Sequence, residues 1–260
     1  MRAALGLSLL LTLGACGRFG FDPTQATQAT LDGALPGNDA LVDAVPDDAA
    51  AGGPAVGFSG HAVGSNVTSL TLGPQAIQTG STVMIVLWGS SNTASATASD
   101  PIAGAYPRDT VLSTASSFAT QRVWIRQGHP GGTTTVSAVW PSSDVEPVMF
   151  LVEIRGARAS NALDVRSSHE DVTGPSYTSD PGTTAGNNEL LVAIHQSSSR
   201  SAQAISFTSG ETMVDAQLNA GSWTGAIGSR RLVAAGPTSV ATTQTAGTSA
   251  VVSLVTLFAP

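Results

Sequence analysis

Few residues in this chain have the types and spacing that chemistry requires. Glu153 stands inside the apolar run VMFLVEIRG, two positions before Arg155. Alternate residues of a strand share one face, so we expect these two side chains to form a structural ion pair. Glycoside hydrolysis by carboxyl groups needs a second acid at a set distance, and the sequence identifies none. A carboxylate-based hydrolase is therefore the least favoured function.

The histidines indicate structural positions rather than a catalytic site. His129 lies in GHPGG, which predicts a hairpin turn, and His195 ends an apolar run, which predicts a packed or rim position. The cluster His169-Glu170-Asp171 predicts a solvated loop, because adjacent side chains on a strand point to opposite faces and cannot all meet one ion. The sequence has no G-x-S-x-G, H-E-x-x-H or P-loop motif. We therefore expect a non-catalytic protein with no metal and no dissociable cofactor.

The segment QRVWIRQ (121–127) gives the best indication of binding. Alternation places Arg122, Trp124 and Arg126 on one face, and Val123 and Ile125 on the other. Aromatic planes stack on sugar rings, and guanidinium groups donate to hydroxyls or carboxylates, so the first face predicts a ligand-binding site. The alternative is an amphipathic strand covered by a neighbouring loop, with the arginine stems packed on the indole.

The chain has four tryptophans, and a second one is a binding candidate. Trp223 lies in the glycine-rich segment NAGSWTGAIG, which predicts a loop. Trp88 and Trp140 belong to apolar or β-branched runs, so we expect them in the core or at its edge.

The only cysteine, Cys16, follows a short positive start and an apolar run at positions 3–13. That run has the length of a signal peptide and is too short to span a bilayer. The tetrapeptide LGAC, which ends at Cys16, resembles the bacterial lipobox. The resemblance implies cleavage between Ala15 and Cys16, a diacylglyceryl group on the thiol, and anchoring in a membrane. The alternative is a free cysteine in an ordinary signal peptide.

Charge and flanking sequence restrict location and partners. Gly17 follows the cysteine instead of the aspartate that favours inner-membrane retention in Gram-negative lipoproteins, so we expect the outer membrane or cell surface of a Gram-negative-type bacterium. The formal net charge of the 260 residues is −7, only 11% of them are charged, and all 11 basic residues are arginine. Nucleic-acid binding needs clustered positive charge, so this composition argues against it.

We divide the chain into three parts. Residues 1–15 are a cleaved signal peptide, residues 16–55 a lipidated N-terminus with an acidic tether, and residues 56–260 a β domain. The segment TQATQATLDGALPGNDALVDAVPDDAAAGGPA has little apolar bulk, several aspartates and no basic residue, which is typical of a disordered linker. A calcium loop is the alternative, but the spacing D-x-[DN]-x-[DN]-G is absent.

The rest of the chain reads as short strands separated by turn residues. The runs at 82–89, 122–127, 134–140, 148–156, 189–196 and 250–258 predict an all-β fold, an antiparallel β-sandwich or jelly roll. Runs 82–88 and 148–154 are continuously apolar and predict central strands that are covered on both faces or lie in a crowded core. A weak internal repeat aligns TVMIVLWGSS with ELLVAIHQSS, so that Trp88 matches His195, and IRQGHP with LVAAGP. We interpret it as two related halves of one double-sheet core.

Four segments in order are similar to a β-sandwich module of large secreted and surface proteins of bacteria. They are STVMIVLWG, RVWIRQGHPGGTTTVSAVW, VMFLVEIRGARASNALDV and TTAGNNELLVAIHQ, and the resemblance covers roughly residues 56–260. It implies a β-sandwich found near adhesion or carbohydrate-binding domains, mostly without known function. The family's D-x-x-G-N-x-[WY] turn is replaced by SDPIAGAYP, in which Asp100, Gly104 and Tyr106 match loosely.

The sequence thus predicts a lipid-anchored envelope protein that displays a non-catalytic β-sandwich and binds a glycan or a protein partner. The alternative from a different class is a structural or assembly lipoprotein of the envelope.

Overall fold

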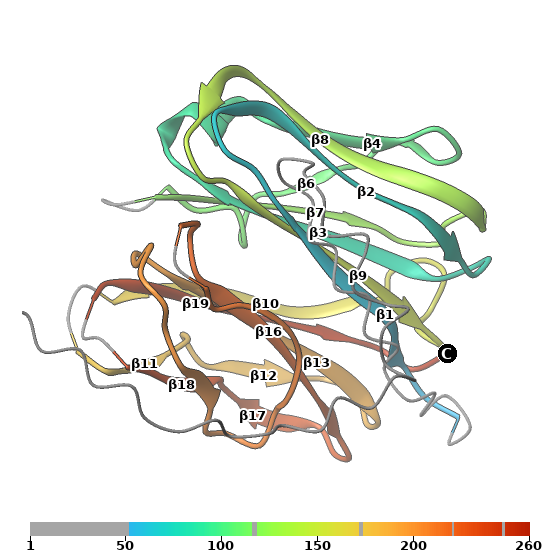
Figure 1. Cartoon of the computed structure of the whole chain (residues 1–260). Helices are drawn as coiled ribbons and strands as arrows, with labels where there is room; N and C mark the ends of the chain where they lie inside the picture. Colours follow the sequence, from blue (N-terminus) through green and yellow to red (C-terminus); the bar gives the residue numbers. More distant parts are fainter. Residues whose placement is uncertain (1–51, 116–118, 172–173, 220, 246–247) are drawn as a thin grey trace, which may run out of the picture. The chain divides into compact units, whose positions relative to one another are not determined.

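The computed structural model describes residues 52–260 apart from 116–118, 172–173, 220 and 246–247. The predicted signal peptide, Cys16 and nearly all of the predicted tether lie outside these residues. The described part is almost entirely antiparallel β-structure, arranged in four layers (Figure 1). The predicted all-β sandwich with a two-fold repeat is therefore confirmed.

The first half of the described chain is a jelly roll made of two sheets. Its inner sheet has the order β1-β9-β3-β7-β6, and its outer sheet the order β2-β8-β4-β5. The inner strands are β1 (Ala55–Val63), β9 (Val148–Arg155), β3 (Thr82–Gly89), β7 (Thr120–Arg126) and β6 (Arg108–Asp109). The outer strands are β2 (Val67–Ile77), β8 (Gly132–Asp144), β4 (Thr97–Asp100) and β5 (Gly104–Ala105); the 3-10 helix η3 (Ser91–Ser95) precedes β4. Apart from the two-residue strands β5 and β6, successive strands alternate between the sheets, which is the connectivity of a jelly roll.

The second half repeats this arrangement. Its inner sheet has the order β10-β19-β13-β16-β15, strand for strand the order of the first inner sheet. These strands are β10 (Leu163–Asp171), β19 (Ala250–Leu257), β13 (Glu189–Ser197), β16 (Gly225–Leu232) and β15 (Thr212–Gln217). The outer layer is β11 (Ser176–Thr178), β18 (Ala241–Gln244) and β14 (Ile205–Phe207), beside the pair β12 (Gly182–Thr184) and β17 (Gly236–Thr238). The aligned residues Trp88 and His195 both lie near the ends of β3 and β13, but Trp88 faces the central core while His195 faces β18 of the outer layer. The predicted match is therefore wrong by one residue, and Ile194 is the neighbour that faces the central core.

The two halves pack through their inner sheets. The central core between these sheets joins Trp88 and Phe150 of the first half, whose ring centroids are 4.7 Å apart, to Ile194 and Ile227 of the second half. Each half also has its own core between inner and outer sheets. The expectation of a single double-sheet core is thus wrong. Each half has an outer sheet as well as an inner one, so the described part contains three cores, one between the halves and one inside each half.

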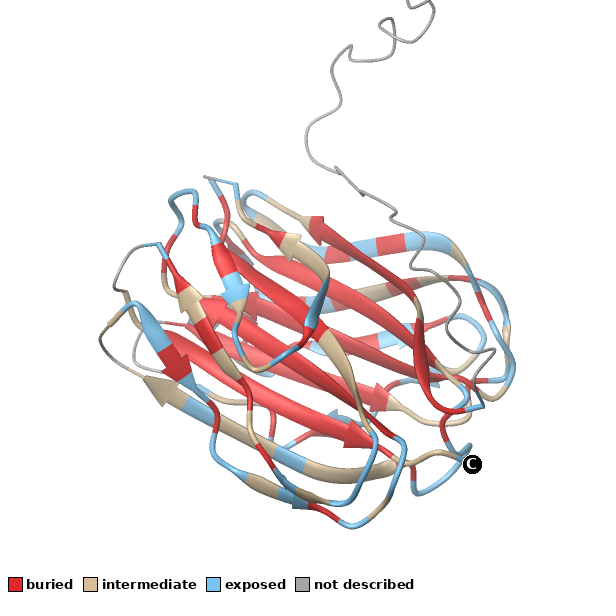
Figure 2. Cartoon of the chain, turned by 90° about the horizontal axis from the view of Figure 1, so that it is seen from below, coloured by how far each residue is buried: buried red, intermediate tan, exposed pale blue. Residues whose placement is uncertain are grey.

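This layering explains the continuous apolar runs. Each inner sheet is covered on both faces, so β3 and β9 are buried along almost their whole length, as predicted. Figure 2, seen from the side of the second outer layer, shows long strands that are buried along most of their length, with exposed residues gathered in loops and outer strands.

Two local predictions are wrong. The GHPGG segment connects β7 of the inner sheet to β8 of the outer sheet, so it is a crossover between layers and not a hairpin. The cluster His169-Glu170-Asp171 belongs to the edge strand β10 rather than to a loop. Both errors have one cause, because sequence shows where a strand ends or carries polar residues but not which strand lies beside it.

Candidate functional site

The predicted binding face on β7 is covered. The alternation is as predicted, because Val123 and Ile125 face the central core while Trp124 faces the other way. That other side is the core of the first jelly roll, where the outer sheet covers the indole and leaves Trp124 only 2% exposed. The expectation of an open Trp124 face is therefore corrected, and the alternative of a covered amphipathic strand describes the structure.

The two flanking arginines have structural surroundings. Arg122 is 7% exposed, and its guanidinium donates to the carbonyl oxygens of Ala94 (2.9 Å), Thr114 (2.7 Å) and Gln121 (2.9 Å). Burial, with a smaller effect of the neighbouring Arg108, lowers the pKa of Arg122. Arg126 is partly buried at the end of β7. Arg122 thus ties β7 to the η3 segment.

Trp223 lies apart from these residues. Its side chain belongs to the central core and is 7% exposed. The guanidinium carbon of Arg200 lies 5.3 Å from the indole centroid, and Arg200 NH1 donates to Glu146 Oε2 at 2.9 Å. Glu146 comes from the first half and Arg200 from the second, so this group closes one end of the junction between the halves. Trp223 is a packing residue there, with no open indole face.

Glu153 is a buried structural carboxylate. It is 0% exposed, and its Oε2 accepts from Arg155 Nε at 3.1 Å and NH2 at 2.9 Å, as the i, i+2 spacing predicts. Its Oε1 accepts from the Gln78 backbone N–H (2.6 Å) and from the Ser81 hydroxyl (2.9 Å). Both oxygens are thus committed to hydrogen bonds that fix the loop before β3.

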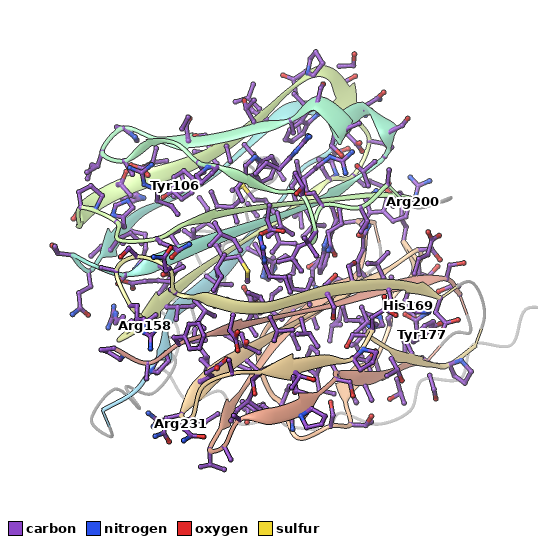
Figure 3. The ribbon with its side chains drawn as sticks, turned by 180° about the vertical axis from the view of Figure 1, so that it is seen from behind. Tyr106, Arg158, His169, Tyr177, Arg200 and Arg231 are labelled. Atoms are coloured by element: carbon purple, nitrogen blue, oxygen red, sulfur yellow. The ribbon has the colours of Figure 1, made fainter. Side chains whose placement is uncertain are left out.

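The histidines also have specific partners. His195 is buried as predicted, with Nδ1 2.8 Å from Thr242 Oγ1 and Nε2 3.1 Å from Gln244 Oε1. Burial lowers the pKa of His195 to about 4, although its Gln244 contact acts in the opposite direction. His169 pairs with Asp180 at the surface, with 2.9 Å between Nδ1 and Oδ1 (Figure 3).

The SDPIAGAYP turn has a structural explanation. Asp100 Oδ1 accepts from the N–H groups of Ile102 (2.6 Å) and Ala103 (2.8 Å), and Oδ2 lies 3.2 Å from His129 Nε2. Burial opposes ionisation of Asp100, but these hydrogen bonds hold its pKa below the ordinary value. Burial, followed by the nearby Asp100 carboxylate, raises the pKa of Tyr106. The loosely matched residues therefore hold the turn together.

The strongest candidate site is a cleft between the two halves, which we call the junction cleft. Its volume is about 210 Å³. The first half supplies Pro107, Arg108, Asp109, Thr110, Ile125 and Gln127, and the second half supplies Leu163 and Arg166. Pro107, Ile125 and Leu163 give it an apolar floor, and the polar groups surround that floor.

Asp109 organises the polar side of the junction cleft. Its Oδ1 accepts from the N–H groups of Val111 (3.0 Å) and Leu112 (2.9 Å), which fixes the carboxylate. Its Oδ2 accepts from Arg166 NH1 at 2.6 Å, so β10 of the second half is held against β6 of the first. Asp109 is buried, while the Arg166 side chain is 38% exposed. The rest of the guanidinium is therefore available to a ligand in a fixed orientation.

Gln127 supplies a second oriented donor. Its Oε1 accepts from the Ala162 backbone N–H at 2.6 Å, which leaves the amide NH₂ as a donor. The charge of Arg166 is already compensated by Asp109, so the cleft offers hydrogen-bond donors with little net charge. Arg108 borders the cleft, but its guanidinium lies on the other side of the sheet, 3.4 Å from the Ala94 carbonyl oxygen.

Sequence reasoning missed the junction cleft because its key pairs join distant segments. Asp109 and Arg166 are 57 positions apart, and nothing in either local sequence marks the other. The same holds for His61 and Asp215, which lie 154 positions apart and place Nδ1 and Oδ1 at 2.8 Å across the opposite side of the junction. Only the strand order of the repeat, which sets β6 over β10 and β1 over β15, could have indicated these pairs.

Comparisons with known proteins assign no family to this chain. No family model matches the chain, and no curated protein matches it. Within the residues that the structure describes, no group of three or more His, Cys, Asp or Glu side chains could hold a metal ion. No helix among those residues has the length and hydropathy of a membrane span.

Proposed function

We propose that this chain is a lipid-anchored envelope protein whose double jelly roll binds a glycan without catalysis. The anchor rests on the LGAC resemblance at Cys16 and the acidic segment behind it. Two or three acyl chains would hold the protein firmly in a membrane, because each buried CH₂ contributes roughly 0.8 kcal/mol.

The anchor is tested by metabolic labelling with palmitate. We expect label in the wild type, in the outer-membrane or surface fraction, and none in Cys16→Ser. Label that survives the substitution would contradict lipidation at Cys16.

The observation that carries the binding function is the junction cleft. Donors fixed by buried partners around an apolar floor are typical of sites for small polar ligands. Its volume of about 210 Å³ is below the ~300–1,000 Å³ of most ligand pockets. It therefore fits one sugar residue, such as a chain end or branch, whose hydroxyls accept from Arg166 and Gln127 while its C–H face packs on Ile125 and Leu163.

Binding is favoured over hydrolysis because the buried acids have structural partners. Both oxygens of Glu153 and both oxygens of Asp109 accept hydrogen bonds that hold loops or join the halves. A general acid or base must instead be free to reach substrate.

The binding function is tested by titrating the full chain in detergent against a polysaccharide array and a cell-wall preparation. Thr110→Val removes one neutral donor, and Gln127→Leu removes one neutral donor together with the acceptor of the Ala162 N–H. We expect about 3- to 10-fold weaker binding in each, since a hydrogen bond contributes roughly 0.5–1.5 kcal/mol. Arg200→Gln is the matched control, because it breaks another Arg–carboxylate pair of the junction far from the cleft. Equal affinity in all four proteins, or no binding at all, would exclude the cleft as the site.

A further inference from the structure

The charged residues of this protein are distributed unevenly between the layers. The inner sheets carry every arginine of the described strands, from Arg108 in β6 to Arg231 in β16. The outer sheet of the first half has only Asp100 and Asp144, and both are buried. The strands of the second outer layer have no charged residue. The two outermost sheets thus expose no charge.

Hydroxyl groups occupy the outer surface of the first outer sheet in register. One cross-strand row joins Thr71 of β2, Ser137 of β8 and Ser99 of β4. The next row joins Ser69, Val139 and Thr97. The side chains of both rows are exposed, apart from Ser137, which is partly exposed. The residues that alternate with them along the strands point into the core, and these are Leu70, Leu72, Val136, Ala138 and Ala98. We call these two rows the hydroxyl face.

The second half repeats this feature at the equivalent strands. Ser176 of β11, Thr243 of β18 and Ser206 of β14 form one cross-strand row. Ser176 and Ser206 are exposed and Thr243 is partly exposed, whereas Tyr177 and Thr242 point inward. The hydroxyl face and the row of the second half thus lie on opposite outermost layers of the described part, above and below the inner sheets in Figure 1.

This surface chemistry is unusual for the water-facing side of a sheet, where charged side chains are common. Ser and Thr both donate and accept hydrogen bonds, and strand geometry repeats them about 4.8 Å across strands and about 6.8 Å along a strand. Long flexible side chains, whose ordering costs most on binding, are absent from the two rows. The half-exposed Val139 adds apolar contact at the middle of its row.

We propose that the hydroxyl face binds the surface of a neutral polysaccharide. Such a polymer presents hydroxyls that both donate and accept, with C–H groups between them, and it has no charge for the face to neutralise. A polyanion would require exposed positive charge, and the face has none. This function goes beyond the proposed sugar site in the junction cleft, since it uses a different surface and recognises an extended polymer rather than one sugar residue.

The test is co-sedimentation of the full chain in detergent with insoluble cellulose, chitin and β-1,3-glucan particles. Ser137→Lys/Val139→Lys places two charges at the centre of the hydroxyl face. Ser142→Lys/Ser143→Lys is the matched control, because it places the same charges at exposed positions of the same strand beyond the two rows. We expect wild type and control to bind at least one polymer within twofold of each other, and the face variant to bind at least fivefold less. Binding should be unchanged in 0.5 M NaCl.

Three results would overturn the proposal: no sedimentation of wild type with any of the three polymers, equal loss in both double variants, or loss of wild-type binding in salt. Light scattering gives a further decisive outcome. If wild type self-associates and only the face variant is monomeric, the face is an interface between copies of this chain.

Discussion

Trp124 stands between two arginines in the sequence and within an apolar cluster in the structure. Strand alternation predicts correctly that it points away from Val123 and Ile125. The covering layer comes from β2, β8 and β4, which are distant in sequence, so alternation alone could not show that the second face is buried as well. The position therefore supports folding rather than ligand contact.

A substitution at Trp124 should affect stability first. Trp124→Ala removes a large buried side chain, and we expect a loss of about 3–5 kcal/mol in the free energy of unfolding. Urea denaturation followed by circular dichroism measures it. A loss below about 1 kcal/mol, with weaker glycan binding, would instead mean that the indole contacts ligand.

His195 gives the fold a defined pH dependence. Its pKa is lowered from 6.5 to about 4 by burial, so the unfolded chain binds more protons than the folded chain between these values. Stability is fully present above the unfolded pKa and is lost as pH falls through the folded pKa. The shift corresponds to a maximum of about 3 kcal/mol.

We expect His195→Gln to remove this contribution, because glutamine does not titrate. The difference in unfolding free energy between wild type and variant should change by up to about 3 kcal/mol from pH 7 to pH 4. Urea denaturation at several pH values measures it. Parallel curves for the two proteins would show that His195 does not titrate as described.

At the scale of elements, close packing of β3 against β16 places the Trp88 ring directly on Gly225. A Cβ at Gly225 would lie 2.1 Å from Cζ3 of Trp88 and 2.4 Å from the His195 carbonyl oxygen. Glycine is therefore required in β16 by the contact between the two halves. The sequence predicts β3, but the loop predicted for NAGSWTGAIG is wrong from Gly225 onward, because β16 begins there.

Gly225→Ala should be strongly destabilising. We expect a loss of about 1–3 kcal/mol or more, as for overpacking in a well-packed core. Trp88→Leu in the same chain should reduce that penalty, because it removes the ring atoms that clash. Denaturation of the two single variants and the double variant measures the coupling. Additive losses would contradict the contact.

Local features of the sites can be predicted from the sequence, whereas contacts between distant segments cannot. The Glu153–Arg155 pair follows from i, i+2 spacing within one strand, and the inward position of His195 follows from its apolar run. The junction cleft depends on which strand edges meet, as at Asp109 and Arg166, and no local pattern encodes that meeting. The six apolar or β-branched strands were thus predictable, whereas the more polar strands β2, β10 and β16, the layer order and the cleft were not.

For the whole described part, the two jelly rolls should unfold together. The central core draws residues from both inner sheets, so separating the halves would expose Trp88, Phe150 and Ile194 to water. Polar contacts such as Arg200–Glu146 and His61–Asp215 lie on different sides of this core. Near-ultraviolet circular dichroism and far-ultraviolet circular dichroism should therefore give one coincident transition. Two separate transitions would show independent halves.

The central claim is that the rigid junction between two jelly rolls forms a glycan site. Hydrogen exchange of the full chain, with and without the best-binding glycan from the array, tests it most directly. We predict slower exchange at 107–110 in the first half and 163–166 in the second, with no change at 122–124 of β7, which lie outside the cleft. Protection confined to other segments, or no protection at saturating glycan, would contradict the account.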